Sequence, residues 1–213
     1  IAMLAFLKAH NRYSYPLVLL AVSLLVYLPQ YTSPQALFWD ENYHVTSAQK
    51  HLDGVMYMET HPPLGKLLMA ASEKALGVNA DLDKSALTRT SYISGDDLPD
   101  GFSFAGMRLP STLLMALSVL FMYGILRRLT GHRLVSAAFS CLLIFDNALV
   151  VHSRAAMLEG IQIFFILAAI YYLVRSLTND TAISLRQYAI LGVLVGLAVS
   201  VKANAAVLLL LFP

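Results

Sequence analysis

Long apolar runs limit what this chain can fold into. A helix needs about 20 mostly apolar residues to cross a bilayer, and such runs recur along most of the sequence. Only 13% of the residues are charged, against about 25% in a typical soluble domain. The sequence therefore predicts an all-α integral membrane protein, with spans at residues 13–31, 109–126, 134–151, 155–174, 188–201 and 203–213.

The last two spans come from one apolar run that is too long for a single crossing. Lys202 interrupts this run, so we predict a break near residues 202–204. The chain ends inside the apolar stretch and begins without a methionine. We therefore expect it to be the N-terminal part of a longer membrane domain whose C-terminal part is missing.

Basic residues mark one side of the predicted membrane. They precede the first span and fill the turns between the second and third and between the fourth and fifth: Lys8, Arg12, Arg127, Arg128, Arg133, Arg175 and Arg186. Positively charged turns usually face the cytoplasm. The segment 32–107 then forms an outer loop, and ten of the thirteen acidic residues lie in it.

The outer loop has helical patterns of its own. Residues 41–52 can form one helix, and residues 63–76 form a better one, with proline in the first turn and Gly77 as a C-terminal stop. The second carries an apolar stripe made by Leu64, Leu67, Leu68, Ala71 and Ala75. We expect such amphipathic helices to lie along the membrane surface, and we expect a loop over residues 81–101.

Composition also narrows the possible partners. The net charge of +2 is too small to indicate nucleic acid as a partner. Cys141 is the single cysteine, which excludes a disulfide within the chain and thiol-based metal sites.

Four motifs follow one another in the sequence. Residues 38–41 read FWDE with His44 just after them, residues 61–66 read HPPLGK, residues 146–154 read DNALVVHSR, and residues 192–202 read GVLVGLAVSVK. In order and spacing they resemble the protein O-mannosyltransferase family, which belongs to the GT-C class of lipid-carrier-dependent glycosyltransferases. The resemblance implies a multi-span GT-C helical bundle.

The resemblance also implies an activity. Mannose would move from a polyprenyl- or dolichyl-phosphate carrier to a Ser or Thr hydroxyl of an acceptor protein, with inversion at the sugar carbon. Two alternatives are a GT-C enzyme with another sugar or a lipid or glycan acceptor, and a non-catalytic partner subunit. A transporter is a further alternative, but its charges should gather near the midplane, whereas here they gather outside.

Such a transfer needs a base for the attacking alcohol and cations for the leaving phosphate. Asp40 is the predicted base; its alternative role is to cap the following helix. Glu41 is the second candidate catalytic carboxylate, and pairing with a cation is its favoured role. Arg154 and Lys202 are candidates for the carrier phosphate, with snorkelling to the membrane surface as the alternative.

Three further residues complete the predicted substrate site. Arg108 is expected there as a residue that orients the outer loop. His61 and Lys66, from the HPPLGK motif, are candidates for contacts to the carrier phosphate. A metal held by Glu41, His44 and His61 is an alternative, but we predict neither a metal nor another cofactor.

The expected partners and location follow from the same reading. The partners are the carrier lipid, the acceptor protein and membrane lipid, and the oligomeric state stays open. The expected location is the bacterial plasma membrane or the endoplasmic reticulum membrane, with the active site on the non-cytoplasmic face.

Overall fold

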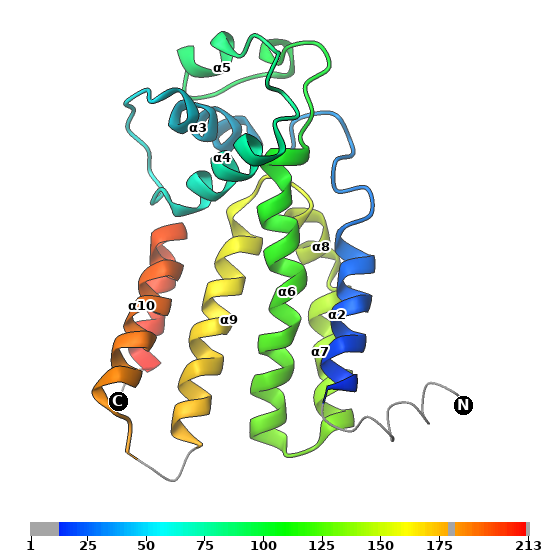
Figure 1. Cartoon of the computed structure of the whole chain (residues 1–213), viewed down its shortest axis with the longest axis vertical. Coiled ribbons are helices and arrows are strands. Elements are labelled where there is room, and N and C mark those ends of the chain that lie inside the picture. The colour runs from blue at the N-terminus through cyan, green and yellow to red at the C-terminus, as the bar shows by residue number, and fades with distance from the viewer. Residues whose placement is uncertain (1–12, 179–181, 212–213) are drawn as a thin grey trace.

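The fold is a helical bundle with a helical cap at one end (Figure 1). A computed structural model describes residues 13–178 and 182–211, and no strand occurs in these ranges. The bundle contains α2 (Ser14–Tyr27), α6 (Ala105–Thr130), α7 (Arg133–Phe145), α8 (Asn147–Ser153), α9 (Leu158–Leu177), α10 (Leu185–Val201) and the 3-10 segment η2 (Ala203–Leu211). The cap contains α3 (Glu41–Asp53), α4 (Leu64–Leu76), α5 (Ser85–Arg89) and the 3-10 turn η1 (Gly95–Asp97).

Helix α6 is the centre of the bundle, with α2, α7 and α9 packed around it and α4 of the cap against its outer end. Small residues bring α6 and α9 close together. A Cβ atom on Gly124 would lie 2.5 Å from the Tyr171 ring, and one on Gly160 would lie 2.5 Å from the Ser111 carbonyl oxygen. Close approach through small residues is a common way for apolar helices to pack in membranes.

Two helices among the described residues, α6 and α9, are long and apolar enough to cross a membrane alone. The predicted span 134–151 is not one straight helix, because α7 and α8 meet at Asp146 with a bend of 54°. Asp146 has an extended backbone, and its side chain accepts a hydrogen bond from the Leu149 amide. The carboxylate thus caps α8.

The other helices differ from the predicted spans at their ends. Helix α2 has 14 residues and stops at Tyr27, before Gln30, which has a φ of 60°. Helix α6 is longer than residues 109–126 at both ends, because Pro110 is accommodated within its early turns and Gly131 ends it with a φ of 73°. Helix α10 starts earlier than predicted, at a capping box formed by Ser184 and Gln187, and it ends at Val201.

The cap contains helices at 41–53 and 64–76, but the face that α4 buries differs from the predicted stripe. Gly65, Lys66, Met69, Ala70 and Glu73 are its buried residues, whereas Leu67, Ala71 and Ala75 are exposed. The reason is that α4 packs against α3 and α6, so the face that includes a lysine and a glutamate turns inward. The placement of this helix along a membrane surface remains a prediction.

The segment 81–101, predicted as loop, contains α5 and η1. Helix α5 packs on α3, and its Leu87 side chain is fully buried. The few apolar residues of this polar stretch are scattered, which gives too weak a pattern to predict so short a helix.

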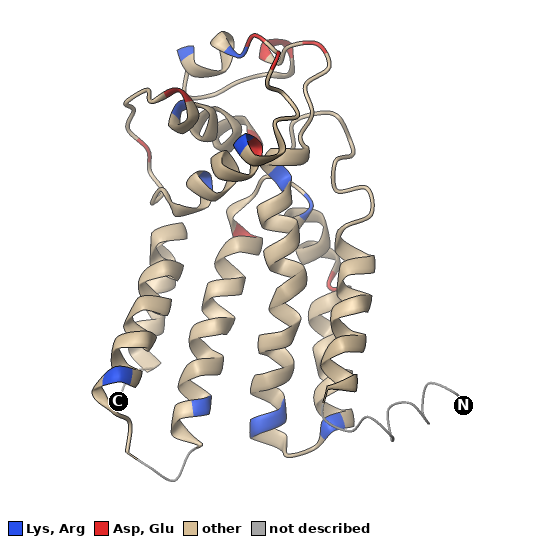
Figure 2. Cartoon of the chain, in the orientation of Figure 1, with Lys and Arg blue, Asp and Glu red and all other residues tan. Residues whose placement is uncertain are grey.

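Charge is distributed unevenly between the two ends of the molecule. Figure 2 shows acidic residues in the cap and where it meets the bundle, while the opposite end of the bundle carries basic residues and no acidic ones among those drawn. This matches the charge asymmetry along the sequence, and it places the candidate site at the acidic end.

Candidate active site

Glu41 is buried and bound on every side. Arg108 donates to both of its carboxylate oxygens, from Nε to Oε1 at 2.7 Å and from Nη2 to Oε2 at 2.8 Å. The amides of Phe38 and Ala156 also donate to it, at 2.8 Å and 2.6 Å. With its side chain fully buried and four donors engaged, the Glu41 carboxylate does not face a substrate. It has the predicted role of pairing with a cation.

Arg108 anchors the segment that leads into α3. Its Nη1 donates to the Pro34 carbonyl and its Nη2 to the Ala36 carbonyl, both at 2.8 Å. The guanidinium also lies 4.1 Å from the centre of the Phe104 ring. Arg108 is only 1% exposed. Because of this burial, it can orient the outer segment but does not touch a carrier phosphate directly.

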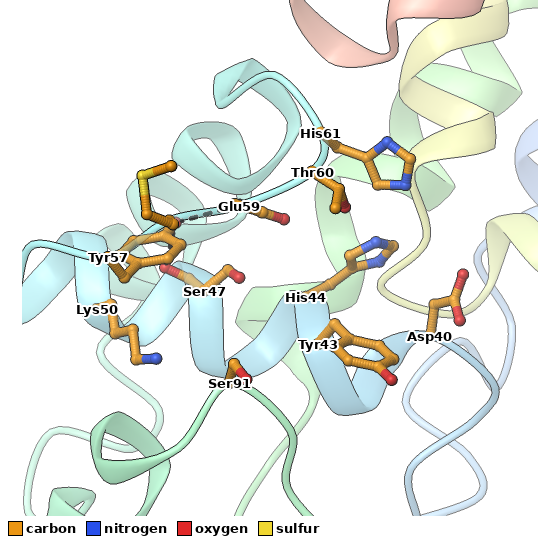
Figure 3. A pocket seen from close by; sticks show the side chains of 11 residues that line it. Asp40, Tyr43, His44, Ser47, Lys50, Tyr57, Glu59, Thr60, His61 and Ser91 are labelled. Carbon is orange, nitrogen blue, oxygen red and sulfur yellow. Dashed lines mark hydrogen bonds between the residues drawn. The ribbon is translucent and has the colours of Figure 1, made fainter.

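Asp40 lies next to Glu41 but has a different environment. It occupies the N-cap position of α3, yet its side chain makes no capping hydrogen bond. The carboxylate is partly exposed and lines a cleft of about 410 Å³. Figure 3 shows Asp40 at one end of this cleft, with His44 and His61 beside it. The preceding residue, Trp39, has a φ of 48°. Residues other than glycine rarely adopt this backbone conformation.

Two histidines line the same end of the cleft. Nδ1 of His44 lies 2.8 Å from the Ala156 carbonyl oxygen; a carbonyl only accepts, so Nδ1 carries the proton. Burial lowers the pKa of His44, and Lys66 lowers it further. Burial, Lys66 and Lys202 likewise lower the pKa of His61. Both rings are therefore neutral at pH 7.

The two lysines of the predicted site form ion pairs of different accessibility. Lys66 pairs with Glu59; its side chain is fully buried, and burial lowers its pKa. Lys202 Nζ lies 2.8 Å from Glu159 Oε1, and these side chains are 27% and 32% exposed. Lys202 is thus the lysine that a ligand could reach.

Arg154 lies outside the cleft. It lines a second cavity, of about 250 Å³, together with Phe38 and Arg108. Its Nη2 donates to the Val26 carbonyl at 2.5 Å, and its Nε is buried without a hydrogen-bond partner among the described residues. Of the predicted site residues, Asp40 and His61 thus line the cleft, Lys202 is near enough for its charge to lower the pKa of His61, and Arg154 borders a separate cavity.

The donors of the alternative metal site are not assembled. Glu41 is taken up by Arg108, and no group of three metal-binding side chains occurs in the part of the chain that the structure describes.

Several lining residues of the cleft were not predicted from the sequence. They are Tyr43, Ser47, Lys50, Tyr57, Met58, Glu59, Thr60 and Ser91. For Tyr43, Ser47 and Lys50 the signal was present, because they follow Asp40 at the three- and four-residue spacing of one helix face. Ser91 comes from a distant loop, and no local pattern marks it.

Comparison with known proteins gives consistent matches. A family model described as dolichyl-phosphate-mannose-protein mannosyltransferase matches residues 17–213. Dolichyl-phosphate-mannose–protein mannosyltransferase 1 of Candida albicans is 31% identical over 72% of this chain and 17% of its own length. The protein of the same name from Saccharomyces cerevisiae is 32% identical over 65% of this chain and 16% of its own length.

A solved structure matches as well. It is that of the S. cerevisiae protein O-mannosyltransferase Pmt1-Pmt2 complex bound to the sugar donor, with a TM-score of 0.77 and 27% sequence identity. The match covers 96% of this chain and 28% of the yeast chain. The chain thus spans less than a third of the length of these proteins.

Proposed function

Because the chain belongs to the dolichyl-phosphate-mannose–protein mannosyltransferase family, we propose that it forms the active site of a protein O-mannosyltransferase. The donor is mannose on a polyprenyl or dolichyl phosphate, and the acceptor is a Ser or Thr hydroxyl of a protein. The observation that carries this proposal is the free carboxylate of Asp40, which stands at the start of α3 without capping it and borders the cleft.

Asp40 acts as the general base in this proposal. The acceptor oxygen attacks the anomeric carbon of mannose from the face opposite the phosphate, which gives inversion. Asp40 takes the hydroxyl proton as the new C–O bond forms and the bond from carbon to phosphate oxygen breaks. A partly exposed carboxylate that makes no capping hydrogen bond is available to accept that proton.

The leaving carrier phosphate keeps its negative charge, so it needs cations and not a proton donor. Lys202 is an accessible cation close to this chemistry, since it is partly exposed and its charge acts on His61. Arg154 supplies a second cation, with an unpartnered Nε beside a cavity. His61 contributes a neutral ring. No metal or other cofactor is part of the proposal.

Lys66, Arg108 and Glu41 hold the site in place. The pair of Glu41 and Arg108 joins the cap to the bundle, and the pair of Lys66 and Glu59 joins α4 to the segment that precedes it within the cap. Fixing a catalytic group in its working direction is a contribution to rate in its own right.

We propose that the cleft faces the non-cytoplasmic side of the bacterial plasma membrane or the endoplasmic reticulum membrane. The distribution of charge supports this orientation, because the end opposite the cap carries the basic turns (Figure 2), which favour the cytoplasm.

A transfer assay tests the function directly. The full-length polypeptide that contains this chain is purified and mixed with polyprenyl phosphate carrying labelled mannose and a Ser/Thr peptide. We expect label on the peptide hydroxyl. Label on a lipid or glycan would indicate a different acceptor class, and no transfer to any acceptor would indicate a non-catalytic subunit.

A further inference from the structure

The end of the cleft opposite Asp40 contains a buried cation that the chemistry proposed above does not use. Lys50 lines the cleft and is only 6% exposed. Its Nζ donates to the Thr90 carbonyl at 2.6 Å and lies 5.2 Å from the centre of the Tyr57 ring. Among the residues that the structure describes, it forms no ion pair with a carboxylate.

Such an environment is unusual for a lysine. Lysine is rarely buried unless it is paired with an opposite charge, and one carbonyl with one aromatic face leaves a donor of the ammonium group unused. The other buried cations of this region differ, because Lys66 pairs with Glu59 and Arg108 with Glu41. The ammonium group of Lys50 therefore has a hydrogen-bond donor available for an anion that enters the cleft.

The position of Lys50 indicates where such an anion comes from. Asp40, Tyr43, Ser47 and Lys50 line the cleft along one face of α3 (Figure 3). The start of α3 is bound to the bundle end through Arg108 and Ala156. Lys50, near the other end of α3, contacts Thr90 and Tyr57 of the cap instead, so its part of the cleft is bordered by the cap and not by the apolar helices that a carrier lipid would contact. An anion at Lys50 thus belongs to the acceptor and not to the carrier.

We propose that Lys50 forms a subsite for an acidic side chain of the acceptor protein, close in sequence to the Ser or Thr that receives the sugar. Asp40 and Lys50 are ten positions apart along α3, which corresponds to about 15 Å on a helix. An extended peptide covers this distance in about four residues. The acidic residue therefore lies three or four positions from the acceptor hydroxyl. This inference rests on the proposed function and adds a selectivity to it.

A peptide series on the full-length protein tests the subsite. Peptides with a single Ser carry Asp, Asn or Lys at the third or fourth position on either side of it. We expect kcat/KM to be about tenfold higher for Asp than for Asn at one of these positions, which corresponds to one charge-assisted hydrogen bond, and lower still for Lys. Equal use of the three peptides at every position overturns the proposal.

Variants assign the effect to Lys50. Lys50→Met should bring the ratio of Asp to Asn peptides to about one, and Lys50→Glu should invert it, because the charge is removed or reversed. Lys74→Met, at an exposed lysine of α4 outside the cleft, should keep the ratio. A Lys50→Met protein that still prefers Asp, or one that loses affinity only for the carrier lipid, contradicts the subsite.

Binding keeps this test separate from the proposed function. Fluorescence anisotropy of labelled peptides, measured without donor, reports the preference for Asp even if no sugar is transferred. Preferential binding of the Asp peptide without transfer would refute the transferase function alone, and transfer without preference would refute the subsite alone.

Discussion

Arg108 holds both carboxylate oxygens of Glu41 across 67 positions of sequence, at 2.7 and 2.8 Å. This pair joins the start of α6 to the start of α3, and both side chains are buried. Consecutive acidic residues thus have separate functions: Glu41 fixes the cap on the bundle, and Asp40 faces the cleft.

Glu41→Gln should destabilise the protein, because it leaves the Arg108 charge buried without its partner. Breaking a buried pair from one side costs about 3–5 kcal/mol. Thermal unfolding of the detergent-purified protein should show a clear drop in the midpoint. Asp40→Asn is the matched control, and an equal drop for both substitutions would contradict the division between the two carboxylates.

Asp40→Asn should retain the fold and lose turnover by about 10²–10⁴-fold, the usual contribution of a positioned general base. Single-turnover transfer of labelled mannose measures the loss. Asp40→Ala should unfold at the same temperature as the natural protein, because the side chain makes no capping bond. An Asp40→Asn enzyme with full activity would refute the mechanism proposed here.

Arg154→Ala should weaken the use of carrier lipid, with a rise in KM for the donor or a loss of kcat. Arg154→Lys should rescue only part of the loss, since an ammonium lacks the planar fork of donors. The donor dependence of the transfer rate is the measurement. Unchanged donor kinetics in Arg154→Ala would leave this arginine as a purely structural link to the Val26 carbonyl.

Acidification should destabilise the cap through His44. Its pKa in the folded protein is below the ordinary value of 6.5, so the unfolded chain binds more protons as the pH falls below that value. Stability therefore is fully present above pH 6.5 and decreases as the pH drops toward the folded pKa. Unfolding midpoints between about pH 7.5 and 5 measure this slope.

The matched variants for this experiment are His44→Gln and His132→Gln. A glutamine at position 44 can still donate to the Ala156 carbonyl but does not titrate, so the slope should become shallower. His132 is exposed at the opposite end of the bundle, and its replacement should leave the slope unchanged. The same slope in all three proteins would show that His44 does not control the pH response.

Cysteine labelling checks the membrane orientation. In a protein whose Cys141 has been replaced by alanine, a cysteine at Asp97 should react with an impermeant reagent from the outer face, and one at Leu129 should not. Leu129 is suitable because it is 65% exposed. A cysteine at the nearby Gly131 would be strained, because that residue has a left-handed backbone. The reverse pattern would place the cleft on the cytoplasmic side.

Apolar runs and basic turns were sufficient to predict the helical membrane class, because burial in lipid demands strong, regular patterns. The sequence did not show the bend at Asp146, since the residues on both sides of Asp146 and Asn147 are mostly apolar and together are long enough for one span. Nor did it show which face of α4 packs against the protein. Lys66 and Glu73 turn inward there because α3 and α6 provide a packing surface, which a single helix pattern does not contain.

For the site, the motifs identified Asp40 and Glu41 and favoured different roles for them, but they did not show which contacts separate the two carboxylates. Asp40, His61 and Lys202 come from three distant motifs and are brought to one region. The difference between Asp40 and Glu41 depends on Arg108 and on the Ala156 amide, which are far away in sequence. Lys50 belongs to none of the four motifs; its spacing from Asp40 places it on the same helix face, but only the structure shows that it is buried without a carboxylate partner among the described residues.

The main chain of Ala156 makes two contacts to α3. Its amide N–H donates to the Glu41 carboxylate at 2.6 Å, and its carbonyl oxygen accepts from the His44 ring at 2.8 Å. These two attachments lie three positions apart on α3, so together they resist rotation of the helix about its own axis. The direction in which Asp40 points is therefore controlled by a stretch of main chain. A substitution at Ala156 leaves both main-chain groups in place, whereas an insertion or deletion of one residue between Arg154 and Leu158 should displace them and misalign the carboxylate without changing any residue of the cleft.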